Sequence, residues 1–527
     1  MKLNIYKYSF ILLSLFLLVA CDESFLNKQP TDSLTTDTYW VNSDNAVQAV
    51  TGCYRFLGGD DWWRTFLTCA TDDSYAWSNW PCDIMYAGNG SATTTLGTFN
   101  HFWSFMYKSI ANTNNVLANI GKVPDMNADL RNQLIGEATF IRAWSYQQLV
   151  GLYGDVPWIT SPQTNPDQYD VSRTSASVVM DSISAQLAKI ADYLPVSYSS
   201  DQFGRATKGA ALALKARIDL YNGNYSAAAT TAKEVMDMNV YTVDPDYMSL
   251  FNGTNEHSSE IILSAQYTDN YKSALATWIG GPTIGGWSEI VPLQSLVDAY
   301  ECTDGKTIDQ SSLYDPQHPF ENRDPRLKMT IVVPGGVLNG DTIDITDPNS
   351  ADGLGKNNAS YTGYYYKKYI PATVDGGWSG NSTNDIIILR YPEVLLTYAE
   401  AKIEMNDIDQ SVYDAIDQVR GRADVNLPPI PTGQSQTAMR QIVRQERRVE
   451  FAEEEQRLFD IRRWKIAENV MPGDVYGILN YWNSARSDYQ KHVLVENRQF
   501  NPQRDYLWPI PQSEVDLNKN LTQNPNW

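Results

Sequence analysis

The sequence predicts a mainly α-helical protein built from antiparallel helix pairs, with one loop-rich face and few short strands. Three observations predict this class: apolar residues at helical spacing in the first half of the chain, a helix–turn–helix pattern around Gly223, and a stretch over 240–390 rich in Gly, Pro, Asn and Asp. The chain has 527 residues and is 43% hydrophobic, which is enough apolar material for a large core.

The first apolar run predicts an export signal. Lys2 and Lys7 precede the run at 10–20, which is too short to span a bilayer. The tetrapeptide LVAC at 18–21 is typical of a lipobox, in which the cysteine is acylated, whereas an ordinary cleaved signal would need a small residue in place of Leu18. We therefore expect a signal peptide over 1–20 and lipidation of Cys21, which would tether the body to a membrane.

The charge of the chain is strongly acidic. The formal net charge is -21, which would repel nucleic acid and anionic lipid surfaces, so we expect no nucleic-acid partner. Asp22 and Glu23 follow Cys21 directly and resemble the export tag of surface-exposed lipoproteins in some Gram-negative bacteria. The predicted location is the outer face of the outer membrane.

The first half of the chain is expected to be mostly helical from 43 to 223, with a loop-rich interruption at 58–100. One helix face is marked by apolar residues at spacings of three and four, with a gap at Ser145. These residues are Leu134, Ala138, Ile141, Leu149 and Leu152.

Two helix pairs are predicted further along. Helices at 207–222 and 226–238 flank Gly223, and the pattern Gly-x-Tyr-x-x-Ala that starts there resembles the turn of a tetratricopeptide repeat. A second pair is expected at 391–404 and 411–423. The expected architecture therefore contains tetratricopeptide-like helix pairs.

Between and after these pairs the pattern changes. Residues 240–390 are loop-rich, with β-prone runs at 260–264 and 329–333, and loops of this kind commonly carry function. A last helix is expected over 437–468, with a solvated face of ion-paired side chains. Its charged residues are Arg444, Glu446, Arg447, Arg448, Glu450, Glu453, Glu454, Glu455 and Arg457.

The sequence favours neither a metal centre nor a cofactor. Cys53, Cys69, Cys82 and Cys302 could form three alternative disulfide pairings, and no CxxC or nearby histidine completes a metal site. The loop at 347–353 offers hard oxygen ligands, although their spacing departs from that of an EF-hand. A structural calcium ion in this loop is the one candidate ion.

Several short segments, in order along nearly the whole mature chain, carry a recognisable pattern. They are 39–40 (YW), 136–143 (GEATFIRA), 153–157 (YGDVP), 292–298 (PLQSLVD), 322–327 (NRDPRL), 389–396 (LRYPEVLL), 398–401 (YAEA) and 507–511 (LWPIP). Together these segments resemble the RagB/SusD family of outer-membrane nutrient-binding lipoproteins. One departure is Glu455, where the family usually has glycine before an arginine; we expect this residue to make the late helix more continuous.

The resemblance implies a helical body with a loop-rich ligand-binding face, divided into an N-terminal region at 21–239 and a C-terminal region at 240–527. It also implies a partner, a TonB-dependent SusC-type porin that the lipoprotein covers as a lid, and an oligosaccharide or polysaccharide ligand. No enzymatic activity is expected. Two alternatives stay open: a surface-tethered glycoside hydrolase, for which Asp72 and Asp73 are the first carboxylate pair to consider, and a peptide-capturing lid of the same fold.

The ligand site is predicted in the early loop-rich region. Residues 54–107 contain 14 aromatic side chains, about twice the chain average of 12%. The segment 72–80 (DDSYAWSNW) alternates rings with polar groups, and a sugar needs both a flat ring for its C–H face and hydrogen-bonding groups for its hydroxyls. The resemblance adds two mid-chain tryptophans beside glycine pairs. The predicted ligand-binding residues are Asp72, Asp73, Tyr75, Trp77, Asn79, Trp80, Trp278 and Trp287.

Overall fold

A computed structural model describes residues 39–58, 62–338, 340–372 and 382–527. The predicted signal peptide and Cys21 lie outside these residues. Within them, no helix is long and apolar enough to cross a membrane.

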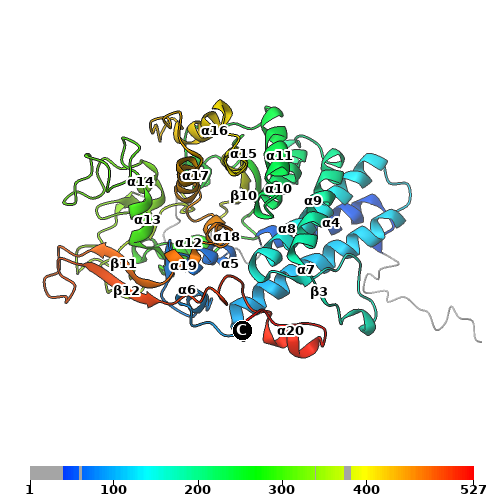
Figure 1. The fold of residues 1–527 in the computed structure, drawn as a ribbon. Helices are drawn as coiled ribbons and strands as arrows, with labels where there is room; N and C mark the ends of the chain where they lie inside the picture. The colour runs from blue at the N-terminus through cyan, green and yellow to red at the C-terminus, as the bar shows by residue number, and fades with distance from the viewer. Residues whose placement is uncertain (1–38, 59–61, 339, 373–381) are drawn as a thin grey trace, which may run out of the picture.

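The N-terminal part is a layer of long helices, seen at the right of Figure 1. The central helix α8 is buried almost all round, because α7 packs on one side of it and α9 on the other. Its side chains Trp144, Tyr146 and Tyr153 are fully buried, and its N-terminus is capped by the side chain of Asn127, which accepts two backbone N–H groups. The helices are α4 Ser43–Gly58, α7 Gly97–Asn119, α8 Ala128–Tyr153 and α9 Ala176–Ile190.

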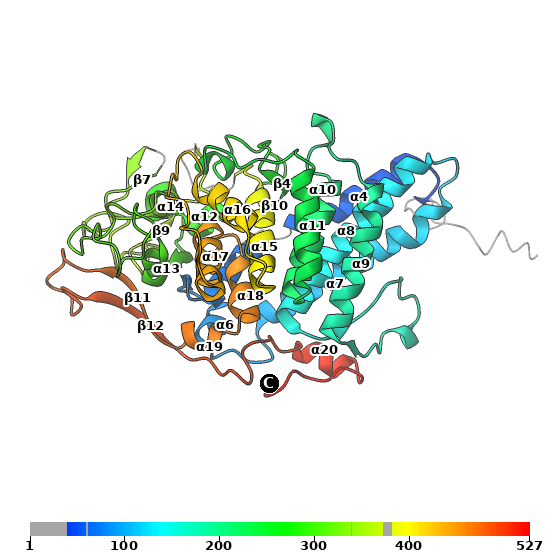
Figure 2. The ribbon, with the colours of Figure 1, turned by 45° about the horizontal axis from the view of Figure 1, so that its top comes forward.

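Both predicted helix pairs are present. Gly223 adopts a positive φ of 78° between α10 and α11, a conformation that glycine adopts without steric cost. Helix α11 also packs against α15, so the two pairs form one layer in which α10, α11 and α15 lie side by side (Figure 2). The pairs are α10 Lys208–Tyr221 with α11 Tyr225–Asp237, and α15 Tyr391–Glu404 with α16 Gln410–Arg420.

The strands form short antiparallel pairs, and two of these pairs join segments far apart in the chain. β1 Ser74–Ala76 pairs with β5 Ile290–Pro292, and β4 Ile261–Ala265 pairs with β10 Ile386–Arg390. The β-prone run at 260–264 is thus confirmed, whereas the run at 329–333 is split between the end of a helix and a two-residue strand.

A longer hairpin extends from the body at the left of Figure 1. It consists of β11 Gly473–Leu479 and β12 His492–Arg498. The other strands are β2 Val156–Pro157, β3 Arg173–Thr174, β6 Ile331–Val332, β7 Val337–Leu338, β8 Asp341–Thr342 and β9 Tyr365–Tyr366. The other α-helices are α5 Trp62–Phe66, α6 Met85–Asn89, α12 Leu275–Ile279, α13 Gln294–Ala299, α14 Arg326–Thr330, α17 Gln436–Glu450, α18 Gln456–Arg463, α19 Ala467–Val470 and α20 Gln512–Leu517.

The expectation of one continuous late helix over 437–468 is wrong. Helix α17 ends at Glu450, and α18 begins only after a turn in which Glu453 and Glu455 both have a positive φ, of 65° and 67°. The left-handed conformation explains why glycine suits position 455. Here the buried carboxylate of Glu455 forms an ion pair of 2.5 Å with Arg64, which helps to hold the residue in that conformation.

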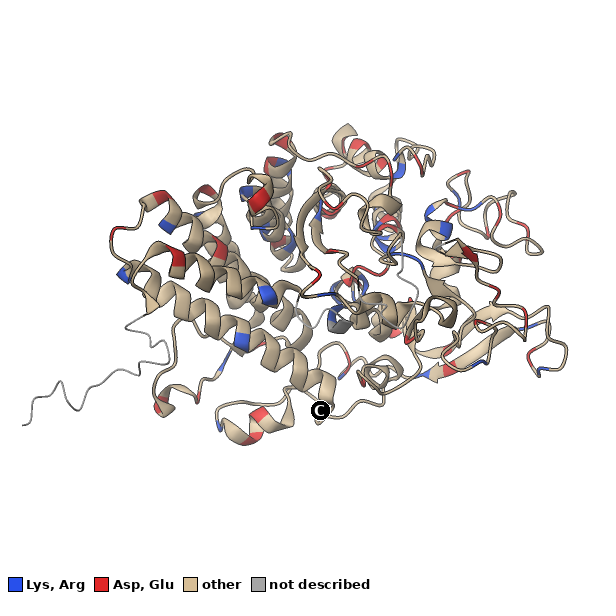
Figure 3. Ribbon diagram, turned by 180° about the vertical axis from the view of Figure 1, so that it is seen from behind, with Lys and Arg blue, Asp and Glu red and all other residues tan. Residues whose placement is uncertain are grey.

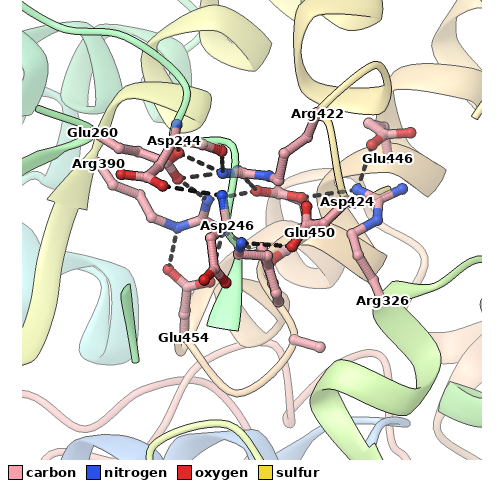
Figure 4. Close-up of polar contacts among 12 residues, drawn as sticks. Asp244, Asp246, Glu260, Arg326, Arg390, Arg422, Asp424, Glu446, Glu450 and Glu454 are labelled. Atoms are coloured by element: carbon pink, nitrogen blue, oxygen red, sulfur yellow. Dashed lines mark hydrogen bonds and ion pairs between the residues drawn. The ribbon is translucent and has the colours of Figure 1, made fainter. Parts of the chain in front are cut away.

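The expectation of a solvated ion-paired face on the late helix is also wrong, because every one of its nine charged residues is buried or half-buried. Figure 4 shows Glu450 at the centre of the network. Its carboxylate contacts Arg390 at 2.5 Å, Arg326 at 2.8 Å and Arg422 at 3.0 Å. Burial alone would raise the pKa of Glu450, but the three guanidinium groups hold it well below its usual range.

The partners of this network come from elements outside the late helix. Glu260 precedes β4, Arg390 ends β10, and Lys368 lies in a loop after β9. Charges of both signs therefore occur at the centre of the molecule as well as on its outer helices (Figure 3). The buried charge network comprises Glu260, Glu301, Asp324, Arg326, Lys368, Arg390, Arg420, Arg422, Glu446, Glu450 and Glu454.

The four cysteines of the described region, Cys53, Cys69, Cys82 and Cys302, are buried and free. Among the described residues, no group of three or more His, Cys, Asp or Glu side chains could hold a metal ion. In the loop considered for calcium, the Asp352 carboxylate is buried and accepts a hydrogen bond from the Thr283 hydroxyl instead.

Candidate functional site

The β1–β5 pair brings the early and mid-chain tryptophans together. Ala76 is opposite Ile290 in the register, so the loop that follows β1 lies beside the residues that precede β5. The loop carries Trp77 and Trp80, and the mid-chain segment carries Trp287. The predicted aromatic residues, separated by about 200 positions in the sequence, therefore form one cluster.

The rings form two groups in direct contact, and the Trp77 indole N–H joins the groups through the backbone of Trp287. The ring centroids of Trp80 and Trp287 are 5.3 Å apart, and each of these rings also meets the edge or face of Trp278, at 5.7 and 5.3 Å. Trp77 stacks on Tyr361, with centroids 5.5 Å apart and planes inclined by 17°. We call these five residues the aromatic platform.

Exposure separates the rings that a ligand can reach from the rings that support them. Trp80 is 59% exposed and Tyr361 50%, while Trp77 and Trp287 are half-buried. Trp278 is only 8% exposed and packs against the core. Single exposed rings are ordinary on a protein surface, but Trp80 and Tyr361 differ because each packs against another ring of the platform.

Hydrogen bonds fix the backbone beneath the platform. The indole N–H of Trp77 donates to the carbonyl oxygen of Trp287 at 3.3 Å, and the backbone N–H of Trp80 donates to the Ser78 hydroxyl at 3.0 Å. Asn79 is exposed between the two tryptophans of the loop. The site therefore combines accessible rings with an amide that can bond a hydroxyl group.

Besides Trp278, three more of the residues predicted to contact ligand lie in the interior. Asp72 and Asp73 are 6% and 1% exposed and form ion pairs with Arg448, at 3.1 and 2.6 Å, and Asp72 also pairs with Arg457 at 2.7 Å. Burial alone would raise the pKa of Asp72, but the two guanidinium groups hold it below its usual range. Tyr75 is buried in β1.

These three residues are therefore supports of the platform. Asp72 and Asp73 are also the carboxylate pair considered for a glycoside hydrolase. Both carboxylates bond arginine side chains and have almost no exposed surface. A general acid or base must reach the substrate, which these two groups do not.

Tyr361 is the member of the platform that sequence reasoning missed. It lies in the loop-rich region, four residues before β9, and its neighbours at 364–366 are also tyrosines. Tyr364, Tyr365 and Tyr366 are buried, and composition gives no sign that Tyr361 differs from them. Its exposure and its stacking on Trp77 distinguish it in the structure.

A layer of paired helices that presents aromatic rings on a loop-rich face defines a helical scaffold for binding. The chain belongs to the SusD family: its family model matches 247–527, more than half of the chain. A second family model, described as starch-binding associating with outer membrane, matches 24–220.

Individual relatives match over nearly their full length. SusD-like protein P2 of Formosa agariphila is 26% identical over 98% of this chain and 99% of its own. A SusD-like carbohydrate binding protein of Bacteroides fragilis, known from a crystal structure, is 29% identical with a TM-score of 0.86, over 92% of this chain and 100% of its own. A laminarin binding SusD-like protein is 24% identical with a TM-score of 0.72, over 92% and 100% of the two chains, and shows the shared fold.

Proposed function

We propose that this protein is a surface-exposed lipoprotein that binds an oligosaccharide or polysaccharide on the aromatic platform and delivers it to a TonB-dependent SusC-type porin for uptake. The observation that carries the proposal is the pair of exposed rings, Trp80 and Tyr361, supported from behind by Trp287 and Trp77. An aromatic face packs against the C–H face of a sugar ring, and the flanking Asn79 can bond hydroxyl groups. The family relatives described as carbohydrate binding support the same ligand class.

The binding step is tested by calorimetric titration of the purified protein with a panel of hexasaccharides: laminarihexaose, maltohexaose, cellohexaose and xylohexaose. Binding of one of them without release of shorter products supports a binding protein. Release of products would support the tethered hydrolase instead. Binding of a peptide pool with no glycan binding would support the peptide-capturing lid.

The lipid anchor yields a first prediction. Cys21→Ala should move the protein from the membrane fraction to the soluble fraction while its thermal melt stays unchanged, because only residue 21 is placed to carry the acyl chains. Membrane fractionation with immunodetection measures the shift. Complete retention of the variant in the membrane fraction would contradict the proposed anchor.

The porin yields a second prediction. Membranes solubilised in mild detergent should release this protein together with a large β-barrel, which mass spectrometry of the affinity-purified complex identifies. Recovery of the wild-type protein only as a free monomer would contradict the proposed partnership.

A further inference from the structure

Glu289 is a buried acid directly behind the aromatic platform. It lies one residue before β5 and is 1% exposed. Because Ala76 is opposite Ile290, Glu289 stands where β1 ends and the loop bearing Trp77 and Trp80 begins.

The contacts of Glu289 join the two segments of the platform. Its carboxyl oxygen Oε1 accepts the backbone N–H of Ser78 at 3.1 Å, inside the loop that carries the two tryptophans. Its own backbone N–H donates to the carbonyl oxygen of Trp278 at 2.7 Å. Glu289 therefore holds residues 77–80 against the segment that presents Trp278 and Trp287.

The surroundings of Glu289 favour its neutral form. Among the described residues, no lysine or arginine forms an ion pair with it, and burial raises its pKa to about 8, opposed only by the Ser78 hydrogen bond. The titratable groups that face it are Cys69 in the 3-10 helix before β1, Tyr75 in β1 and Cys82 before α6. Burial raises the pKa of all three, so none supplies a compensating positive charge.

We propose that Glu289 is a positioning residue whose neutral carboxyl group keeps the loop 77–80 closed against the mid-chain tryptophans, so that protonation of Glu289 regulates glycan binding. This proposal rests on the proposed function. Among the described residues, the Glu289 carboxyl group does not contact the exposed faces of Trp80 or Tyr361. It acts on the loop 77–80 through its hydrogen bond with the Ser78 N–H.

The direction of the pH effect follows from linkage. When the loop opens, water reaches Glu289 and its pKa returns towards the ordinary value of 4.5, whereas in the closed loop it is about 8. The closed form therefore binds the proton more tightly, and the closed form loses stability relative to the open form as pH rises from 4.5 to about 8. Above that range both forms are ionised, and the closed fraction changes no further.

The test compares wild type with two variants in which the carboxyl group is altered. Glu289→Gln keeps an acceptor of similar shape but has no charge to gain, and Glu289→Leu removes the acceptor. Hydrogen–deuterium exchange of the amides at 77–80, expressed as protection factors, reports loop closure without ligand. Calorimetric titration with the tightest-binding of laminarihexaose, maltohexaose, cellohexaose and xylohexaose reports binding.

We expect Glu289→Leu to lose protection at Ser78 and to bind the hexasaccharide about fivefold more weakly at pH 6, as for a lost hydrogen bond, while Glu289→Gln stays within about twofold of wild type. Between about pH 5 and pH 8.5, wild-type protection and affinity should fall by at least about threefold and then level off, whereas those of Glu289→Gln should stay constant.

Two results would overturn the role of Glu289. One is that Glu289→Leu has the same protection factors and affinity as wild type. The other is that wild type and Glu289→Gln have the same pH dependence. The second comparison stands even where Glu289→Leu does not fold. The exchange data decide the positioning role without any glycan, so failure of the wild-type protein to bind every hexasaccharide would count against the proposed function alone.

Discussion

Arg390→Met is expected to lower the free energy of unfolding by about 3–5 kcal/mol, the usual cost of removing one partner from a buried ion pair. The Arg390 guanidinium is 1% exposed and contacts Glu450 at 2.5 Å, Glu454 at 2.7 Å and Glu260 at 3.0 Å. Methionine fills much of the same volume but leaves these carboxylates short of positive charge. Water cannot compensate them because the site is closed to solvent.

Urea denaturation followed by circular dichroism measures the change. The matched control is Lys233→Met, which removes the positive partner of an exposed ion pair with Asp237 within α11 and should leave the unfolding midpoint almost unchanged. Equal midpoints for the two variants would show that the buried charge network contributes no more than a surface pair. Folded Arg390→Met should bind glycan like wild type, since Arg390 belongs to the buried charge network and is not part of the aromatic platform.

Trp80→Ala should weaken binding of the preferred hexasaccharide by at least ~1 kcal/mol, about fivefold in Kd, with little change in thermal stability. The ring is 59% exposed, so its removal takes away a surface for the sugar and leaves no internal cavity. Trp77→Ala should also weaken binding, through the loss of the stack that orients Tyr361. Calorimetry and a thermal melt on each variant measure the two effects separately.

Two further variants make this result specific. Tyr169→Ala removes a ring that is 54% exposed but is not part of the aromatic platform, and should bind like wild type. Trp278→Ala removes a buried ring and should destabilise the fold by about 3–5 kcal/mol, as for other large core side chains. A collapse of the melting temperature in Trp80→Ala, or unchanged affinity in both Trp77→Ala and Trp80→Ala, would place the binding site elsewhere.

The helical scaffold was predictable because its signals are local. The glycine turn at Gly223 and the apolar residues of α8 at spacings of three and four are local patterns. The late helix was not predictable by the same reasoning. Glu455 is a good helix former by propensity, but its buried pairing with Arg64 holds it in a left-handed turn.

The candidate site was predictable only in part, for a related reason. The rings of Trp77, Trp80, Trp278 and Trp287 were identified by composition and by the family resemblance, and the structure brings them together. Asp72 and Asp73 were predicted as ligand-binding groups because their neighbours in the sequence include no cation. Their arginine partners lie in the late helices, and no local pattern predicts such a pairing. The exposure of Tyr361 depends on contacts between loops, and no pattern in a single sequence predicts such contacts.

The contacts of residues 71–73, just before β1, constrain the order in which the protein can fold. Asp73 and Arg448 are 375 residues apart, Asp72 and Arg457 are 385 apart, and Arg498 bonds the carbonyl oxygen of Thr71 across 427 positions. When residues 71–73 leave the ribosome, the cations that neutralise them do not yet exist. Closing such long loops slows folding, and a chain that stops before α17 would leave two acids without partners. The residues that lead into β1 therefore gain these partners only once the chain through Arg498 is present.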